Sequence, residues 1–108
     1  MRDHMALGDK LKTLERLAEL GGEDRIIDQT LTKLLDYAAA RYQQELEDLT
    51  SKLRVLEDQF GMTSGQFYEK FHGGELGDDE AFFRWDALVE MQRRLTQRLA
   101  ILQTDASS

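Results

Sequence analysis

The chain of 108 residues contains no cysteine and no proline. The absence of cysteine excludes disulfides, thiolate metal sites and cysteine nucleophiles together. The absence of proline, with an abundance of Leu, Ala, Glu, Gln and Arg, favours helices, because these side chains lose little rotamer freedom in a helix. Alternating apolar and polar residues typical of β-strands are lacking as well. The sequence therefore predicts an all-α protein in a single domain.

The sequence also lacks long apolar stretches and clustered basic residues. No run of about 18 apolar residues could span a bilayer, and the first residues lack the apolar core of a signal peptide, so we expect a cytoplasmic protein with no membrane contact. A net charge of -7 argues against direct binding of nucleic acid, which requires basic groups against phosphates. The acidity fits either a basic protein partner or a solvated surface that aids solubility.

What is present is helical periodicity. Residues 23–60 contain neither Gly nor Pro, and their apolar residues recur at steps of four and three, which predicts one long helix. These residues are Leu31, Leu35, Ala38, Tyr42, Leu46, Leu49, Leu53, Leu56 and Phe60. At about 1.5 Å per residue such a helix measures roughly 57 Å, so we expect an elongated protein or one completed by a partner.

Shorter helices are expected on both sides of it. Residues 1–6 form a flexible start or an expression remnant, and an amphipathic helix over 7–20 should end at Gly21 and Gly22 and fold back antiparallel on the first half of the long helix. Thr63 and Gln66 resemble a capping box that opens a short helix over 63–72, which Gly73 and Gly74 end. Asp78 or Asp79 should cap a last helix over 78–102, antiparallel to the second half of the long helix, before a frayed tail over 103–108. The expected architecture is an elongated antiparallel helical hairpin with coiled-coil character.

A candidate self-association surface lies near the middle of the long helix. The apolar spacing changes between Leu35 and Leu46 to an eleven-residue step, which alters the direction of supercoiling. Small side chains at the same place allow a second helix to approach closely, either from a second copy or from the same chain. The candidate residues are Leu35, Ala38, Ala39, Tyr42 and Leu46.

Two patterns could carry metal chemistry. Glu69 and His72 have the Glu-x-x-His spacing of carboxylate-bridged di-iron bundles, and Glu45 and Asp48 resemble the acidic pairs that hold Mg²⁺ in all-helical hydrolases. Each pattern occurs alone, whereas both kinds of centre need matching ligands from other helices. We therefore expect no catalytic residues, no metal site and no cofactor, and we do not expect an enzyme.

The strongest remaining signal is aromatic. Most of the aromatic residues fall between Phe60 and Trp85, around an acidic turn. Large aromatic side chains beside a charged rim are typical anchors of protein interfaces, whereas the alternative is a small aromatic core that holds the short helix. The candidate partner-binding residues are Phe67, Phe71, Glu75, Asp78, Asp79, Phe82, Phe83 and Trp85.

Residues 62–88 resemble a known group of proteins. The resemblance rests on Thr63, Phe67, Phe71, Gly74, Leu76, Gly77, Asp78, Asp79, Phe82, Phe83, Trp85 and Leu88. The segment is similar to the C-terminal part of small all-helical antitoxins from prokaryotic toxin-antitoxin pairs. This resemblance implies that the chain binds and neutralises a toxin encoded alongside it, often an RNA-cleaving or nucleotide-transferring protein. The chain shows no recognisable DNA-binding domain, so the resemblance does not extend to control of its own transcription.

The resulting hypothesis is an antitoxin-like inhibitor that neutralises a cognate toxin, and we expect this toxin to be a basic protein that acts on nucleic acid. We also expect the chain itself to form homo-oligomers. One alternative is a structural coiled-coil protein that only associates with itself. A second alternative is a metal-dependent all-helical hydrolase.

Overall fold

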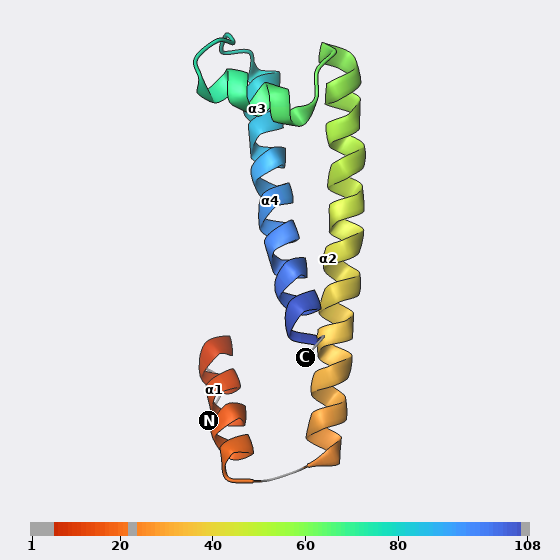
Figure 1. Cartoon of the computed structure of the whole chain (residues 1–108), viewed down its shortest axis with the longest axis vertical. Helices are drawn as coiled ribbons and strands as arrows, with labels where there is room; N and C mark the ends of the chain where they lie inside the picture. The colour runs from red at the N-terminus through yellow and green to blue at the C-terminus, as the bar shows by residue number, and fades with distance from the viewer. Residues whose placement is uncertain (1–5, 22–23, 107–108) are drawn as a thin grey trace. The chain divides into compact units, whose positions relative to one another are not determined.

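A computed structural model describes residues 6–21 and 24–106, and every regular element in these residues is a helix (Figure 1). The helices are α1 (Leu7–Glu19), α2 (Arg25–Phe60), α3 (Ser64–His72) and α4 (Glu80–Ala106). The all-α prediction is confirmed, and the long helix is continuous over 36 residues. The chain divides into two compact units between Leu34 and Leu35.

Side-chain and glycine signals fix the ends of α2. The Asp24 carboxylate accepts hydrogen bonds from the backbone N–H groups of Ile26, at 2.9 Å, and of Ile27, at 3.2 Å. These two donors have no partner within the helix, so Asp24 caps it. At the other end Gly61 adopts a φ of 67°, which is favourable for glycine and ends the helix after Phe60. The predicted start at Glu23 lies outside the described residues.

The predicted capping box of α3 is present. The backbone N–H of Gln66 donates to the Thr63 hydroxyl, and the backbone N–H of Thr63 donates to the Gln66 amide oxygen, both at 3.0 Å. Gly73 and Gly74 follow the helix as expected, and Gly74 has a φ of 75°. Local sequence rules therefore account for both ends of this nine-residue helix.

Helix α4 differs from its predicted bounds at both ends. It begins at Glu80 because Asp79 is its cap, with the Asp79 carboxylate accepting from the backbone N–H of Ala81 at 2.9 Å. It continues to Ala106 instead of Leu102, since no glycine or proline follows to stop it. The expected tail over 103–108 is therefore helical as far as Ala106, and residues 107–108 lie outside the description.

The core lies in the second unit, between the second half of α2, α3 and α4. Two contacts between α2 and α4 show the relative direction of these helices. The ring centroids of Phe60 and Trp85 are 5.6 Å apart, and Cζ of Arg98 lies 5.6 Å from the centroid of the Tyr42 ring. Because sequence number rises along α2 as it falls along α4, the two helices are antiparallel, as predicted (Figure 1). The buried residues are Leu49, Leu53, Leu56, Phe67, Trp85, Val89, Leu95 and Leu99.

The first unit has a different character. Helix α1 was expected to cover the first half of α2, but none of its residues is buried, and Leu7 is 72% and Leu20 85% exposed. The facing apolar residues of α1 and of the start of α2 border an open hollow of about 740 Å³ rather than interlocking. The predicted covering of this stretch is therefore wrong for the first unit, which buries no apolar core of its own among its described residues.

Candidate protein-binding surface

The aromatic segment is built around two buried rings. Phe67 of α3 and Trp85 of α4 are both 0% exposed, and their rings stack at 4.0 Å with an angle of 5°. The Trp85 indole N–H donates to the Ser64 hydroxyl at 3.0 Å, and the Ser64 backbone N–H donates to the Glu57 carboxylate at 2.8 Å. Ser64 therefore links α3 to both long helices. Phe67 and Trp85 were predicted to contact a partner, but they have no exposed surface and form the core instead.

Half-buried rings surround this pair. The Phe71 ring stacks on the Phe67 ring with 5.3 Å between their centroids. The centroid of the Phe82 ring lies 5.8 Å from that of Phe67 and 5.2 Å from that of Phe60. Such offset and tilted arrangements are favourable between aromatic rings because they bring ring edges towards ring faces. Phe71 and Phe82 are therefore partly buried and pack against the core cluster.

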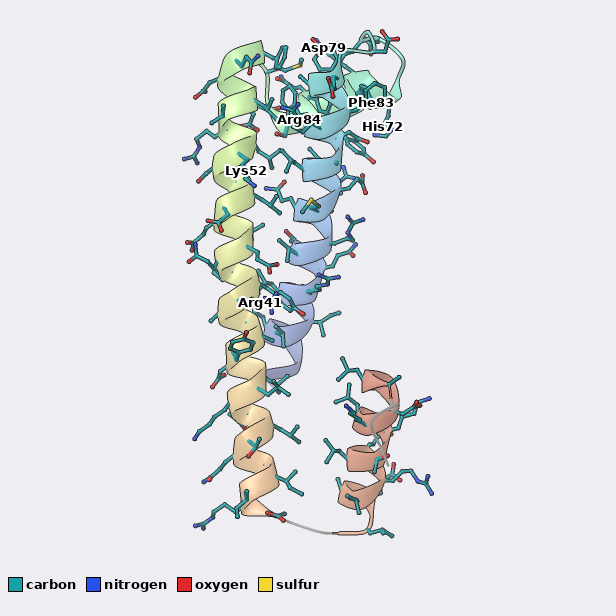
Figure 2. All side chains as sticks on the ribbon, turned by 180° about the vertical axis from the view of Figure 1, so that it is seen from behind. Arg41, Lys52, His72, Asp79, Phe83 and Arg84 are labelled. Atoms are coloured by element: carbon teal, nitrogen blue, oxygen red, sulfur yellow. The ribbon has the colours of Figure 1, made fainter. Side chains whose placement is uncertain are left out.

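Phe83 is the aromatic residue of this segment that faces solvent. Its side chain is 56% exposed, although its ring still meets Phe71 edge-on at 5.4 Å and 88°. Figure 2 shows Phe83 and His72 on the same side of the α3–α4 end, and the Phe71 ring contacts both of them. A large exposed ring thus lies at the surface against the half-buried Phe71 ring.

The predicted acidic residues lie in the connection before α4. Glu75, Asp78 and Asp79 are all exposed. Asp79 already uses one carboxylate oxygen to cap α4, which fixes its position one helical turn before Phe83. The α3–α4 end therefore combines one exposed aromatic ring with carboxylates that are free to meet solvent or a basic group.

A polar network that the sequence did not predict lies beside this surface. His72 and Asp86 form a contact of 2.7 Å between Nε2 and Oδ1, and the Arg93 guanidinium lies 3.9 Å from the centre of the Tyr68 ring. A hydrogen bond from the Tyr68 hydroxyl to Glu90 raises the pKa of Tyr68. Residues 72 and 86 belong to different helices, so no local spacing pattern could have linked them.

The patterns considered for metal binding are not assembled into a larger site. Glu45 accepts a hydrogen bond from Arg41 at 3.2 Å, and Asp48 accepts one from Gln44 at 3.2 Å. The His72 side chain contacts Asp86, as described above, and not Glu69, the other residue of the Glu-x-x-His pattern. Within the part of the chain that the structure describes, no three His, Asp or Glu side chains gather as a metal site would require.

The predicted self-association residues are divided between two environments. Leu35 is 53% exposed, whereas Ala38, Ala39, Tyr42 and Leu46 are half-buried. Tyr42 lies beneath Arg98 of α4, so part of this stretch faces the chain's own last helix.

Among the described residues, no helix is long and apolar enough to cross a bilayer. Comparison of the chain with models of protein families, with curated proteins and with solved structures gave no match.

Proposed function

We propose that this chain binds another protein and acts as an antitoxin-like inhibitor of a cognate toxin in the cytoplasm. The observation that carries the proposal is Phe83, a large ring that is 56% exposed although it contacts the half-buried Phe71 ring at the edge of the aromatic core. Burying such a ring in a partner's pocket releases water from apolar surface while costing little side-chain entropy, because Phe71 already restricts it.

The charge next to Phe83 indicates the kind of partner. Glu75, Asp78 and Asp79 are exposed at the same end of the second unit. Exposed carboxylates at the same end of the unit as an aromatic anchor favour a basic partner, because complementary charge speeds association and excludes acidic competitors. Proteins that act on nucleic acid carry such basic surfaces, which fits a toxin that cleaves RNA or transfers nucleotides.

Co-expression with the protein encoded next to this chain tests the proposal. We expect that protein to arrest growth when produced alone and the wild-type chain to restore growth. Phe83→Ala should weaken the complex by about 10- to 100-fold, the range for an anchor residue worth roughly 1.4–2.8 kcal/mol, and should fail to restore growth at low expression.

Val55→Ala is the matched control, because Val55 is 65% exposed on α2 and belongs to no aromatic cluster. It should restore growth as the wild type does. Full rescue by Phe83→Ala, or a neighbouring protein that has no effect on growth, would contradict the proposal.

A further inference from the structure

The apolar face of α2 extends beyond the part that α4 covers. Starting from Phe60 and moving towards the N-terminus, apolar residues continue at steps of three and four through Leu35 and Leu31 to Ile27. Leu49 and Leu53 on this face are 5% and 3% exposed, whereas Ile27 is 37% exposed. The first three turns of α2 thus carry the same type of surface that packs a helix further along, but with solvent on it.

Helix α1 carries a second uncovered row. Leu7, Leu11, Leu14 and Ala18 follow one another at steps of four, three and four, which places them on one face. Leu7 and Leu11 are 72% and 49% exposed, and no residue of the helix is buried. Residues 7–18 and 27–34 therefore present two apolar rows in which Leu14 and Leu31 are half-buried and no residue is buried.

The charge of this region differs from that of the whole chain. Residues 6–34 contain six acidic and five basic side chains, a net charge of -1, whereas the whole chain carries a net charge of -7. The acidic residues are Asp9, Glu15, Glu19, Glu23, Asp24 and Asp28, and the basic residues are Lys10, Lys12, Arg16, Arg25 and Lys33. Two copies of an acidic protein can therefore approach through this region with little net repulsion between the surfaces that meet.

We propose that a second copy of the chain covers these rows, so that residues 7–18 and 27–34 of two copies form a two-fold dimer. In a two-fold interface both copies use the same patch. The two apolar rows of one copy therefore pack against the same two rows of the other copy, which have equal spacing. Two such pairs make a four-helix arrangement, which buries all four rows at once. A standard interface uses about 20–30 residues from each partner, which is the size of this segment.

This dimer uses residues 7–18 and 27–34, whereas the proposed toxin-binding surface contains Phe83. Each of the two proposals can therefore be tested without the other. It also moves the expected self-association site. The centre shifts from Ala38, Ala39, Tyr42 and Leu46, which are half-buried, to the exposed residues that precede Leu35.

Sedimentation equilibrium of the full chain over a wide range of concentration tests the proposal. The wild type should show a mass near twice 12.5 kDa, and the variant Leu11→Glu with Ile27→Glu should show 12.5 kDa. Two carboxylates placed in an apolar interface should raise the dissociation constant by at least about 100-fold. Urea unfolding followed by Trp85 fluorescence should be unchanged, because both residues are exposed and outside the core of the second unit.

The matched control is Val55→Glu with Ile101→Glu. Val55 and Ile101 are 65% and 60% exposed on α2 and α4, and this variant loses two apolar side chains and gains two charges just as the test variant does. It should remain dimeric, and so should Phe83→Ala. A wild-type chain that stays at 12.5 kDa throughout, a test variant that stays dimeric, or a control that dissociates equally would each overturn the proposal.

Energy transfer between copies gives a second measurement that needs no disruptive variant. The chain has no cysteine, so Glu19→Cys introduces one labelling site at the exposed end of α1. Mixing donor-labelled and acceptor-labelled copies should produce transfer that unlabelled wild-type chain competes away. Absence of transfer would mean that each chain's own α1, or a different protein, covers the rows, and the proposal would be wrong.

Discussion

Phe67 and Phe83 belong to the same aromatic segment but differ in burial. Phe67 is 0% exposed and stacks on Trp85, whereas Phe83 is 56% exposed and touches the cluster only through Phe71. Phe83 precedes Trp85 by two positions, which turns it about 200° around α4 and away from the core. A side chain of one type is thus a core residue in one place and a surface anchor in the other.

Replacing these two residues by alanine should separate stability from binding. Phe67→Ala removes a fully buried ring and should lower the free energy of unfolding by about 3–5 kcal/mol. Phe83→Ala leaves the buried rings in place, so the loss should be about 1 kcal/mol or less. Urea unfolding followed by the fluorescence of Trp85, the single tryptophan, measures both. Equal losses for the two variants would contradict the assignment of Phe83 to the surface.

Short helix α3 depends on the signals at its ends. Nine residues are too few for a stable isolated helix, so the capping box at Thr63 and the contacts of Ser64 with Trp85 and Glu57 hold it. The connection from α2 depends on Gly61, whose φ of 67° is unfavourable for any residue with a Cβ atom. The chain can therefore turn from α2 into α3 within three residues.

Two glycine substitutions test this turn. An added Cβ at Gly61 meets nothing within 4 Å, so Gly61→Ala reports backbone strain alone. The left-handed conformation costs roughly 1–2 kcal/mol for alanine, and a smaller gain from a less flexible unfolded chain leaves a net loss of about 1 kcal/mol. Gly65→Ala, inside α3 and with its nearest contact at 3.9 Å, should instead raise stability by about 0.5–1 kcal/mol. Thermal unfolding of both variants gives the comparison, and a stabilising Gly61→Ala would refute it.

The two units of the chain differ in what holds them. The second unit buries leucines, a valine and two large aromatic rings, whereas the described residues from 6 to 34 bury none of their side chains. Regions with few buried apolar contacts open at a lower free energy than a packed core. Helix α1 therefore needs a partner to be as stable as α4, and a second copy would supply one.

Hydrogen exchange at two protein concentrations makes this difference measurable. In the dimer, backbone amides of α1 should be protected, and dilution below the dissociation constant should speed their exchange by at least about tenfold. Amides near Leu53 and Val89 should exchange slowly at both concentrations, because their burial lies within one chain. Exchange in α1 that does not depend on concentration would contradict a dimer through this helix.

Much of the helix layout could be predicted from the residues alone. The capping box at Thr63, the glycine at position 61 and the apolar spacing of α2 act within four residues along the chain, so their effect is readable in the sequence. The end of α4 was predicted four residues too early, because no glycine or proline in the sequence marks where this helix stops.

The candidate site depended on packing between helices that are distant in sequence. The aromatic segment directed the site hypothesis to the α3–α4 end, but its residues alone could not distinguish the buried Trp85 from the exposed Phe83. Nor could they pair His72 with Asp86 or leave α1 uncovered. A helical period fixes which side chains share a face, whereas burial depends on which other helix meets that face, and this is a property of the folded chain.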